Sequence, residues 1–94
     1  MVNKKILFKN LKPGDYIIYK DQTFGTAFNY FDKVLEVDKD NFKYRAVALW
    51  DITCGDLYSE EYEFPKDIEM RASIRKAKPA EIKKYLEEVT IARI

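Results

Sequence analysis

The chain has 94 residues, of which 47% are hydrophobic and 15% aromatic. This length suits one compact domain and excludes two, and the apolar content excludes a disordered chain. Seventeen basic and sixteen acidic residues give a net charge of +1, which argues against strong nonspecific attraction to nucleic acid but leaves a local basic patch open.

The cysteine content and the apolar runs indicate the compartment. Cys54 is the single cysteine, so an internal disulfide is impossible and a reducing compartment fits. The apolar patch from Ile6 to Phe8 is shorter than a secretory signal requires. No apolar run reaches the roughly 20 residues of a membrane helix. We therefore expect a cytoplasmic protein without membrane contact.

The N-terminal segment, residues 1–12, is basic. It contains four lysines and no acid: Lys4, Lys5, Lys9 and Lys12. A basic arm of this kind could touch phosphates. The simpler interpretation is a solvated segment that Ile6 and Phe8 attach to the folded part.

Residues 13–76 are expected to form a β domain. Turn sequences fall at 12–15, 38–41, 53–56 and 65–67. Between them lie stretches rich in Tyr, Phe, Ile and Val, which suit strands. Residues 21–30 form a long first connection that carries Phe24, Phe28 and Tyr30. The pattern predicts a mainly β fold, an SH3-like five-stranded barrel with a short C-terminal α-helix.

The clearest hairpin lies within residues 31–50 and turns at Asp-Lys-Asp-Asn. Pairing Val37 with Phe42 places apolar side chains on one face. The same register brings Glu36 opposite Lys43, an opposite-charge cross-strand pair. A register that satisfies both faces is the one normally adopted.

A second hairpin is predicted in the stretch from residue 60 to 76, where acids precede bases. Folding it at Pro-Lys-Asp places Tyr58 opposite Ile74 and lets acids meet bases on the wet face. Glu60 then falls on the apolar face. We therefore expect a β-bulge or a strand end close to Glu60.

Residues 79–89 are expected to form a helix. Pro79 suits the first helical position because its missing N–H is not needed there. Lys78 would be the N-cap, although Ser, Thr, Asp or Asn is preferred. An apolar stripe with helical spacing follows: Ile82, Tyr85, Leu86 and Val89.

The start of this helix, Ile74-Arg75-Lys76-Ala77-Lys78-Pro79-Ala80-Glu81-Ile82, resembles the strand-to-helix junction of small uncharacterised SH3-like-barrel proteins of gut bacteria and their phages. Those proteins often begin the helix with Arg-x-Ala-Thr-Pro-x-Glu, and Lys78 stands here in place of the Thr. The resemblance is limited to this stretch. It implies a β domain followed by a helix and a bacterial or phage origin, and it implies no site residues.

Enzymatic chemistry finds little support, and we expect no catalytic residue, cofactor or metal. The chain has no histidine, which removes the commonest general base and metal ligand. Cys54 lies in a turn without a basic neighbour that would activate it. The aspartates at 38, 40, 51 and 56 fit turn chemistry. A reactive Cys54 or an aspartate site remains a third, weaker hypothesis.

The aromatic residues favour a noncatalytic module that binds a protein or peptide, because aromatic-lined surfaces of small barrels recognise peptides. Most of the rings are assigned to the core, and Tyr30 and Trp50, which lie near strand ends, are expected to be exposed. Self-association is one form of this hypothesis. It is favoured by apolar residues without an obvious core position: Val47, Leu49 and Leu57.

The alternative function is nucleic-acid binding by a basic surface. Exposed rings would stack on bases beside Lys43 and Arg45. A second basic candidate is the corner between the last strand and the helix, formed by Arg75, Lys76 and Lys78, which have no acids opposite them in the predicted hairpin.

Overall fold

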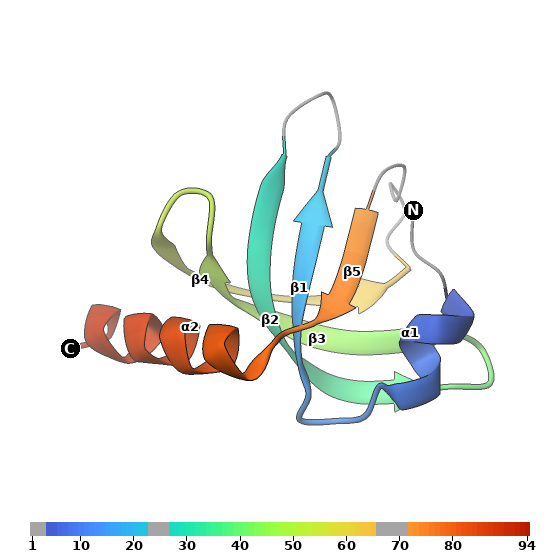
Figure 1. The fold of residues 1–94 in the computed structure, drawn as a ribbon. Coiled ribbons are helices and arrows are strands. Elements are labelled where there is room, and N and C mark those ends of the chain that lie inside the picture. Colours follow the sequence, from blue (N-terminus) through green and yellow to red (C-terminus); the bar gives the residue numbers. More distant parts are fainter. Residues whose placement is uncertain (1–3, 23–26, 66–71) are drawn as a thin grey trace.

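The fold is a curved antiparallel sheet with a helix near each end of the chain (Figure 1). The computed structural model describes residues 4–22, 27–65 and 72–94. The elements in chain order are α1 (Lys4–Asn10), β1 (Tyr16–Asp21), β2 (Phe28–Asp38), β3 (Lys43–Asp51), β4 (Asp56–Phe64), β5 (Ala72–Lys76) and α2 (Pro79–Ala92). The mainly β class, the five strands and the C-terminal helix are confirmed.

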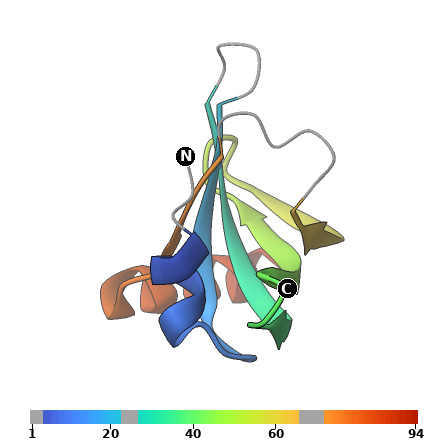
Figure 2. The ribbon, with the colours of Figure 1, turned by 90° about the vertical axis from the view of Figure 1, so that its right-hand side faces the viewer.

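The five strands form a single sheet in the order β4-β3-β2-β1-β5. Each neighbouring pair is antiparallel. Within the described residues the sheet ends at β4 and β5 and is not closed into a barrel. The two helices lie at different ends of the sheet, and the view turned by 90° shows how strongly the strands bend (Figures 1 and 2).

The two faces of the sheet carry separate cores. Ile17 belongs to the core that contains residues of α1, and Ile18 belongs to the core that contains residues of α2. Adjacent residues of a strand point to opposite faces, so α1 and α2 cover opposite faces of β1. We name these the α1 face and the α2 face.

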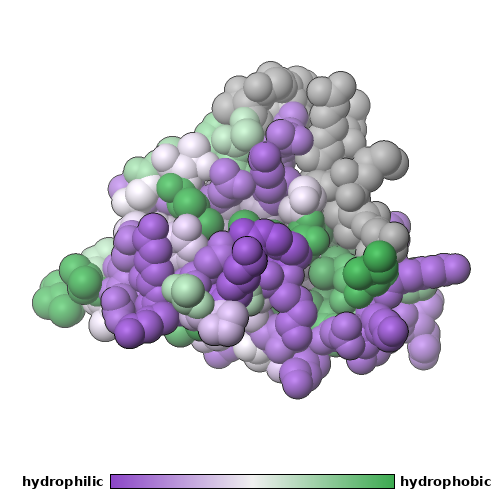
Figure 3. Space-filling view, viewed as in Figure 1, coloured by the Kyte–Doolittle hydropathy of each residue, from purple (hydrophilic) through white to green (hydrophobic). Residues whose placement is uncertain are grey.

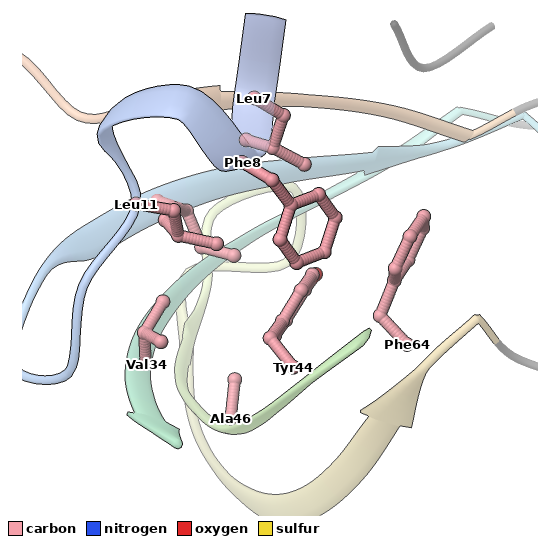
Figure 4. Packing of buried hydrophobic residues seen from close by; sticks show 8 residues of the cluster. Leu7, Phe8, Leu11, Val34, Tyr44, Ala46 and Phe64 are labelled. Carbon is pink, nitrogen blue, oxygen red and sulfur yellow. The ribbon is translucent and has the colours of Figure 1, made fainter. Parts of the chain in front are cut away.

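The α1 face corrects the expectation of a solvated N-terminal arm. Leu7, Phe8 and Leu11 are buried, whereas Ile6 is 70% exposed, so only Phe8 of the two expected anchors is buried. The ring of Phe8 lies among aromatic rings of the sheet, with centroids 6.1 Å from that of Tyr44 (Figure 4). Buried side chains spaced along one side of the segment explain why it is helical rather than extended.

The α2 face confirms the predicted apolar stripe. Val89 is buried and the other three stripe residues pack against the same core, which includes Phe31 and Trp50. The helix continues to Ala92, beyond the expected end at residue 89. Figure 3 shows a mostly hydrophilic surface over α2, with hydrophobic residues at its C-terminal end, where Ile91 is 69% exposed.

The β2–β3 hairpin forms, but its predicted register was wrong by two residues. Val37 lies opposite Tyr44 instead of Phe42. The side chain of Asp38 accepts hydrogen bonds from Asn41 N and Nδ2 at 3.3 and 2.9 Å, which shapes the turn. Phe42 takes a positive φ of 52° and packs against the α1-face core. A shift of two residues keeps Val37 on the same face.

Within the described residues, β4 and β5 do not pair as the predicted hairpin requires. Ile74 pairs with Tyr19 of β1, not with Tyr58 of β4, and β4 and β5 are the two edges of the sheet. Ile74 packs against the α1-face core from this position. Residues 66–71, which include most of the predicted turn, lie outside the described residues.

The bulge expected near Glu60 is present. Glu60 lies opposite Ala48 and Leu57 lies opposite Trp50, so β4 has one more residue than β3 in this interval. Such an insertion changes which residues of a strand share a face. Neither described helix has the length and apolar character needed to cross a bilayer.

Candidate functional site

A polar cleft of about 210 Å³ lies on the α1 face, beside the core that α1 covers. Its lining combines four tyrosines, three acids and an alanine: Tyr19, Asp21, Tyr30, Asp32, Ala48, Tyr58, Glu60 and Tyr62. We call it the tyrosine cleft. Among the described lining residues, the charged side chains are the three acids.

The sheet register builds the floor of the cleft. Asp32 of β2 lies opposite Ala48 of β3, which in turn lies opposite Glu60 of β4. The methyl side chain of Ala48 fills little of the space between the two acids. Asp32 is 1% exposed and Ala48 is 4% exposed, whereas Glu60 is exposed. One acid therefore lies at the floor and another at the rim.

A chain of hydrogen bonds fixes the floor. The Tyr62 hydroxyl donates to Oδ2 of Asp32, and it lies 3.0 Å from the Tyr44 hydroxyl. Because the single proton of Tyr62 is directed to Asp32, the hydroxyl of Tyr44 is the donor to Tyr62. Burial, followed by the negative charge of Asp32, raises the pKa of Tyr62 well above its usual range. Tyr62 therefore stays neutral and continues to donate.

The rim is built in the same way. The Tyr58 hydroxyl donates to Oε2 of Glu60, and this hydrogen bond raises the pKa of Tyr58 to about 12. The ring of Tyr30 lies against that of Tyr58, with centroids 5.2 Å apart. Burial, then the nearby charge of Asp51, raises the pKa of Tyr30. Tyr30 and Tyr58 thus form an uncharged aromatic wall beside a carboxylate.

The cleft therefore has the chemistry of a site for an organic cation. Carboxylates attract positive charge, and the faces of tyrosine rings attract cations through their quadrupole. A hard metal ion is a poorer match, because no group of three or more Cys, Asp or Glu side chains in the described part of the chain converges as a metal site would.

Of the two aromatic residues expected to be exposed, only Tyr30 lies at a site. Trp50 is 6% exposed and belongs to the α2-face core with Phe31 and Val89, so the expectation of an exposed Trp50 was wrong. Between Ala48 and Trp50, β3 has one more residue than β2, and this bulge allows Trp50 to lie on the opposite face from Ala48. A buried indole offers no surface to a partner.

Lys43 and Arg45 line a larger, shallower cavity of about 510 Å³ between the ends of β2, β3 and β4. Arg45 lies 2.8 Å from Glu36, and it also pairs with Glu61. These acids raise the pKa of Arg45, with the hydrogen bond to Glu36 as the largest cause. The register shift thus gives Glu36 an arginine partner in place of the predicted Lys43.

The basic corner is also engaged by acids. Arg75 donates to both carboxylate oxygens of Glu81 at 2.7 Å. Nζ of Lys76 lies 3.3 Å from Asp15. Lys78 is exposed, and its backbone N–H donates to Oε1 of Glu81 at 2.8 Å. The predicted hairpin placed no acids opposite these three residues, whereas α2 and the loop before β1 supply acids to Arg75 and Lys76.

The apolar residues that favoured self-association divide into two groups. Leu49 packs against the α2-face core, and Val47 is half-buried. Leu57 is 40% exposed. The apolar side chain of Leu49 is thus explained by packing inside the fold, because strand β3 is covered on both sides, and not by a contact surface for a partner.

The turn around Cys54 is explained by local hydrogen bonds. The carboxylate of Asp51 accepts the Cys54 backbone N–H at 3.0 Å, and Gly55 donates to the carbonyl of Asp51 at 2.8 Å. A hydrogen bond with Asp51 is the largest cause that raises the pKa of the exposed Cys54 thiol. A raised pKa lowers the fraction of thiolate, the nucleophilic form.

Sequence reasoning missed most of the tyrosine cleft, although a signal was present. Asp32 stands between Tyr30 and Val34 at the spacing of one strand face, and Glu60 stands between Tyr58 and Tyr62 in the same way. An acid at such a position interrupts an apolar face. From the sequence alone, Glu60 indicates only a β-bulge or a strand end.

No protein-family model matches the sequence, and neither the curated proteins nor the solved structures gave a match. The candidate site therefore rests on the geometry of this chain alone.

Proposed function

We propose that this protein is a noncatalytic interaction module that binds a basic segment of a partner protein or peptide at the tyrosine cleft. The observation that carries the proposal is the lining of the cleft, to which the described residues contribute four tyrosine rings and three acids. A cationic side chain of the partner would enter between the rim and the floor. The rings would contact its apolar stem and the carboxylates would bind its charged end.

The neutral state of the rings supports this function. Tyr30, Tyr58 and Tyr62 all have raised pKa values, so they remain uncharged around neutral pH. The rings therefore act as aromatic surfaces, and the negative charge is confined to the acids. A single cation–π contact contributes about 0.5–1 kcal/mol at an exposed site. One bound side chain gives weak affinity, so we expect further contacts along the partner.

The SH3-like barrel is part of the proposal. Strands β1 to β4 follow one another across the sheet and β5 returns beside β1, an order that suits a small barrel whose sheet bends back on itself. We further propose a cytoplasmic role in a bacterium or a phage. This proposal is supported by the strand-to-helix junction around Pro79, which resembles that of small proteins of gut bacteria and their phages.

Nucleic-acid binding is less well supported. Arg45, Arg75 and Lys76 each lie within ion-pair distance of an acid, and phosphate binding would have to compete with these acids. The tyrosine cleft itself would repel phosphate. Nucleic acid is therefore included as a competing ligand in the test.

The test is a set of NMR titrations of the isotope-labelled chain with three probes: a peptide containing Lys and Arg, an acidic peptide of equal length, and single-stranded DNA. We expect the basic peptide alone to shift the backbone amides of Tyr30, Asp32 and Glu60. Raising the salt concentration should weaken this binding moderately, because the rim acid is exposed to solvent.

Matched variants localise the binding. Glu60→Gln removes a charge from the cleft, whereas Glu63→Gln removes the same charge from the same strand outside it. Likewise Tyr30→Leu removes a ring of the cleft, and Phe28→Leu removes a partly exposed ring that does not line it. Only the first of each pair should weaken binding. DNA binding at Lys43 and Arg45 with no effect of basic peptides would establish the alternative function instead.

A further inference from the structure

We propose that the partner segment binds as an extended strand along the outer edge of β4, with basic residues at alternate positions facing the tyrosine cleft. The inference rests on the proposed function and specifies the conformation and the charge pattern of the bound segment. It depends on three features of β4: its position in the sheet, the face that its side chains occupy, and the distribution of charge on its two sides.

Within the described residues, β4 is one of the two edge strands of the sheet, and β3 is its neighbour. In an antiparallel sheet, every second residue of an edge strand directs its backbone N–H and C=O away from the neighbouring strand. A peptide can hydrogen-bond to these groups as an additional strand. β4 has nine residues, whereas β5, the other edge strand, has five. β4 therefore offers the longer edge.

The side chains of β4 place this edge directly beside the tyrosine cleft. Tyr58, Glu60 and Tyr62 belong to the lining of the cleft. Directly paired residues of neighbouring strands have Cβ atoms about 4.5–5.5 Å apart, so a partner residue paired with Glu60 would put its side chain next to the cleft. The partner residues two positions before and after it would face the same way. One extended segment thus supplies the further contacts that a single bound side chain lacks.

The charge of β4 favours basic side chains on the cleft side. Glu60 is exposed, and it lies in the lining of the cleft. On the other side, Glu61 is paired with Arg45, and Arg45 also lies opposite Glu63 in the register of the sheet. A cation on that side would approach the arginine as well as the acids. Bases at every second position, separated by neutral residues, therefore match β4 best.

The same charges oppose the pairing of two copies of this chain through β4. The strand contains four acids and no base: Asp56, Glu60, Glu61 and Glu63. An antiparallel pair of β4 strands centred on this acidic stretch would bring like charges close together, which is destabilising. Charged side chains commonly protect edge strands in this way. The edge thus discriminates against a second copy and in favour of a basic segment.

The experiment titrates the isotope-labelled intact chain with a peptide as long as β4, in which lysine and threonine alternate. Two derivatives carry N-methyl groups, one on the lysine amides and the other on the threonine amides. Because alternate residues of a strand direct their N–H groups to opposite edges, only one derivative loses the N–H groups that face β4. We expect that derivative to bind at least about tenfold more weakly, through the loss of backbone hydrogen bonds, and the other to bind like the parent peptide.

A peptide of the same composition, with its lysines grouped at one end, tests the alternation and should bind more weakly than the parent. Nuclear Overhauser effects between the backbone protons of the parent peptide and those of Glu60 and Tyr62 should locate the added strand at β4. Equal affinity of the grouped peptide would overturn the alternating charge pattern.

The outcomes separate the inference from the proposed function. Equal affinities of the two methylated derivatives, or backbone contacts of the peptide with β5, overturn strand addition at β4. Shifts of the Tyr30 and Asp32 amides by the parent peptide would then leave the proposed function in place, with binding by side chains alone. If no basic peptide shifts these amides, the proposed function fails together with the inference.

Discussion

Arg75 of β5 and Glu81 of α2 form a two-point ion pair, with Nη1 and Nη2 each 2.7 Å from a carboxylate oxygen. The same carboxylate accepts the backbone N–H of Lys78 at the start of the helix. Glu81 therefore caps α2 and links it to the edge of the sheet. The sequence assigned Arg75 to a binding surface, whereas the structure assigns it a partner within the fold.

Glu81→Gln should lower the free energy of unfolding by about 1 kcal/mol around neutral pH, because a partly exposed pair is screened by solvent. The ion pair is the largest cause that lowers the pKa of Glu81 from 4.5 to about 2. Since the folded-state pKa is depressed, the stabilisation is present above pH 4.5 and is lost as the pH falls toward 2.

Urea unfolding of the wild type and of Glu81→Gln, measured across this pH range, checks the prediction. The difference between them should shrink as the pH approaches 2. Glu87→Gln, an exposed acid of the same helix, serves as the control and should change stability little at any pH. A difference that persists undiminished at the lowest pH would contradict the role of the Glu81 charge.

The hydrogen bond from Tyr58 to Glu60 predicts a tyrosine that titrates late. The pKa of Tyr58 is raised from 10.0 to about 12, so this interaction stabilises the fold below pH 10 and is lost as the pH rises toward 12. Glu60→Gln removes the charge and should lower the pKa of Tyr58. Ultraviolet titration of tyrosinate, with Tyr58→Phe to assign the residue, measures both values. An unchanged titration in Glu60→Gln would refute the link.

Some of the fold was predictable because it depends on local sequence. Pro79 and the apolar stripe of α2 specify a helix by position and spacing alone. The face of Val37 was also predicted correctly, but its pairing was not. The turn geometry of Asp38 and the positive φ of Phe42 set the register, and neither follows from alternation.

The remaining differences come from contacts distant in sequence. Ile74 pairs with Tyr19, not with Tyr58, because the last strand joins the far edge of the sheet. The tyrosine cleft likewise requires Asp32 and Glu60 to meet across Ala48, and strand order decides this. A sequence pattern can show that an acid interrupts an apolar face, but it does not show which other acid lies beside it.

Phe8 and Ile6 test the packing of α1. Sequence reasoning treated them alike, yet Phe8 is 2% exposed and Ile6 is 70% exposed. Phe8→Ala should destabilise the protein by about 3–5 kcal/mol through loss of burial and formation of a cavity. Ile6→Ala should change stability by less than about 0.5 kcal/mol. Thermal unfolding of both variants makes the comparison, and similar losses would mean that α1 does not pack as described.

Trp50 provides an optical test of the α2 face, because it is the single tryptophan of the chain. At 6% exposure, its indole should emit at a shorter wavelength in the folded than in the unfolded protein, and iodide should quench it poorly. Binding of the basic peptide at the tyrosine cleft should change this emission little, since Trp50 lies on the opposite face. Quenching as strong as that of the unfolded chain would restore Trp50 as a surface residue. A large emission change on ligand binding would place the ligand on the α2 face instead.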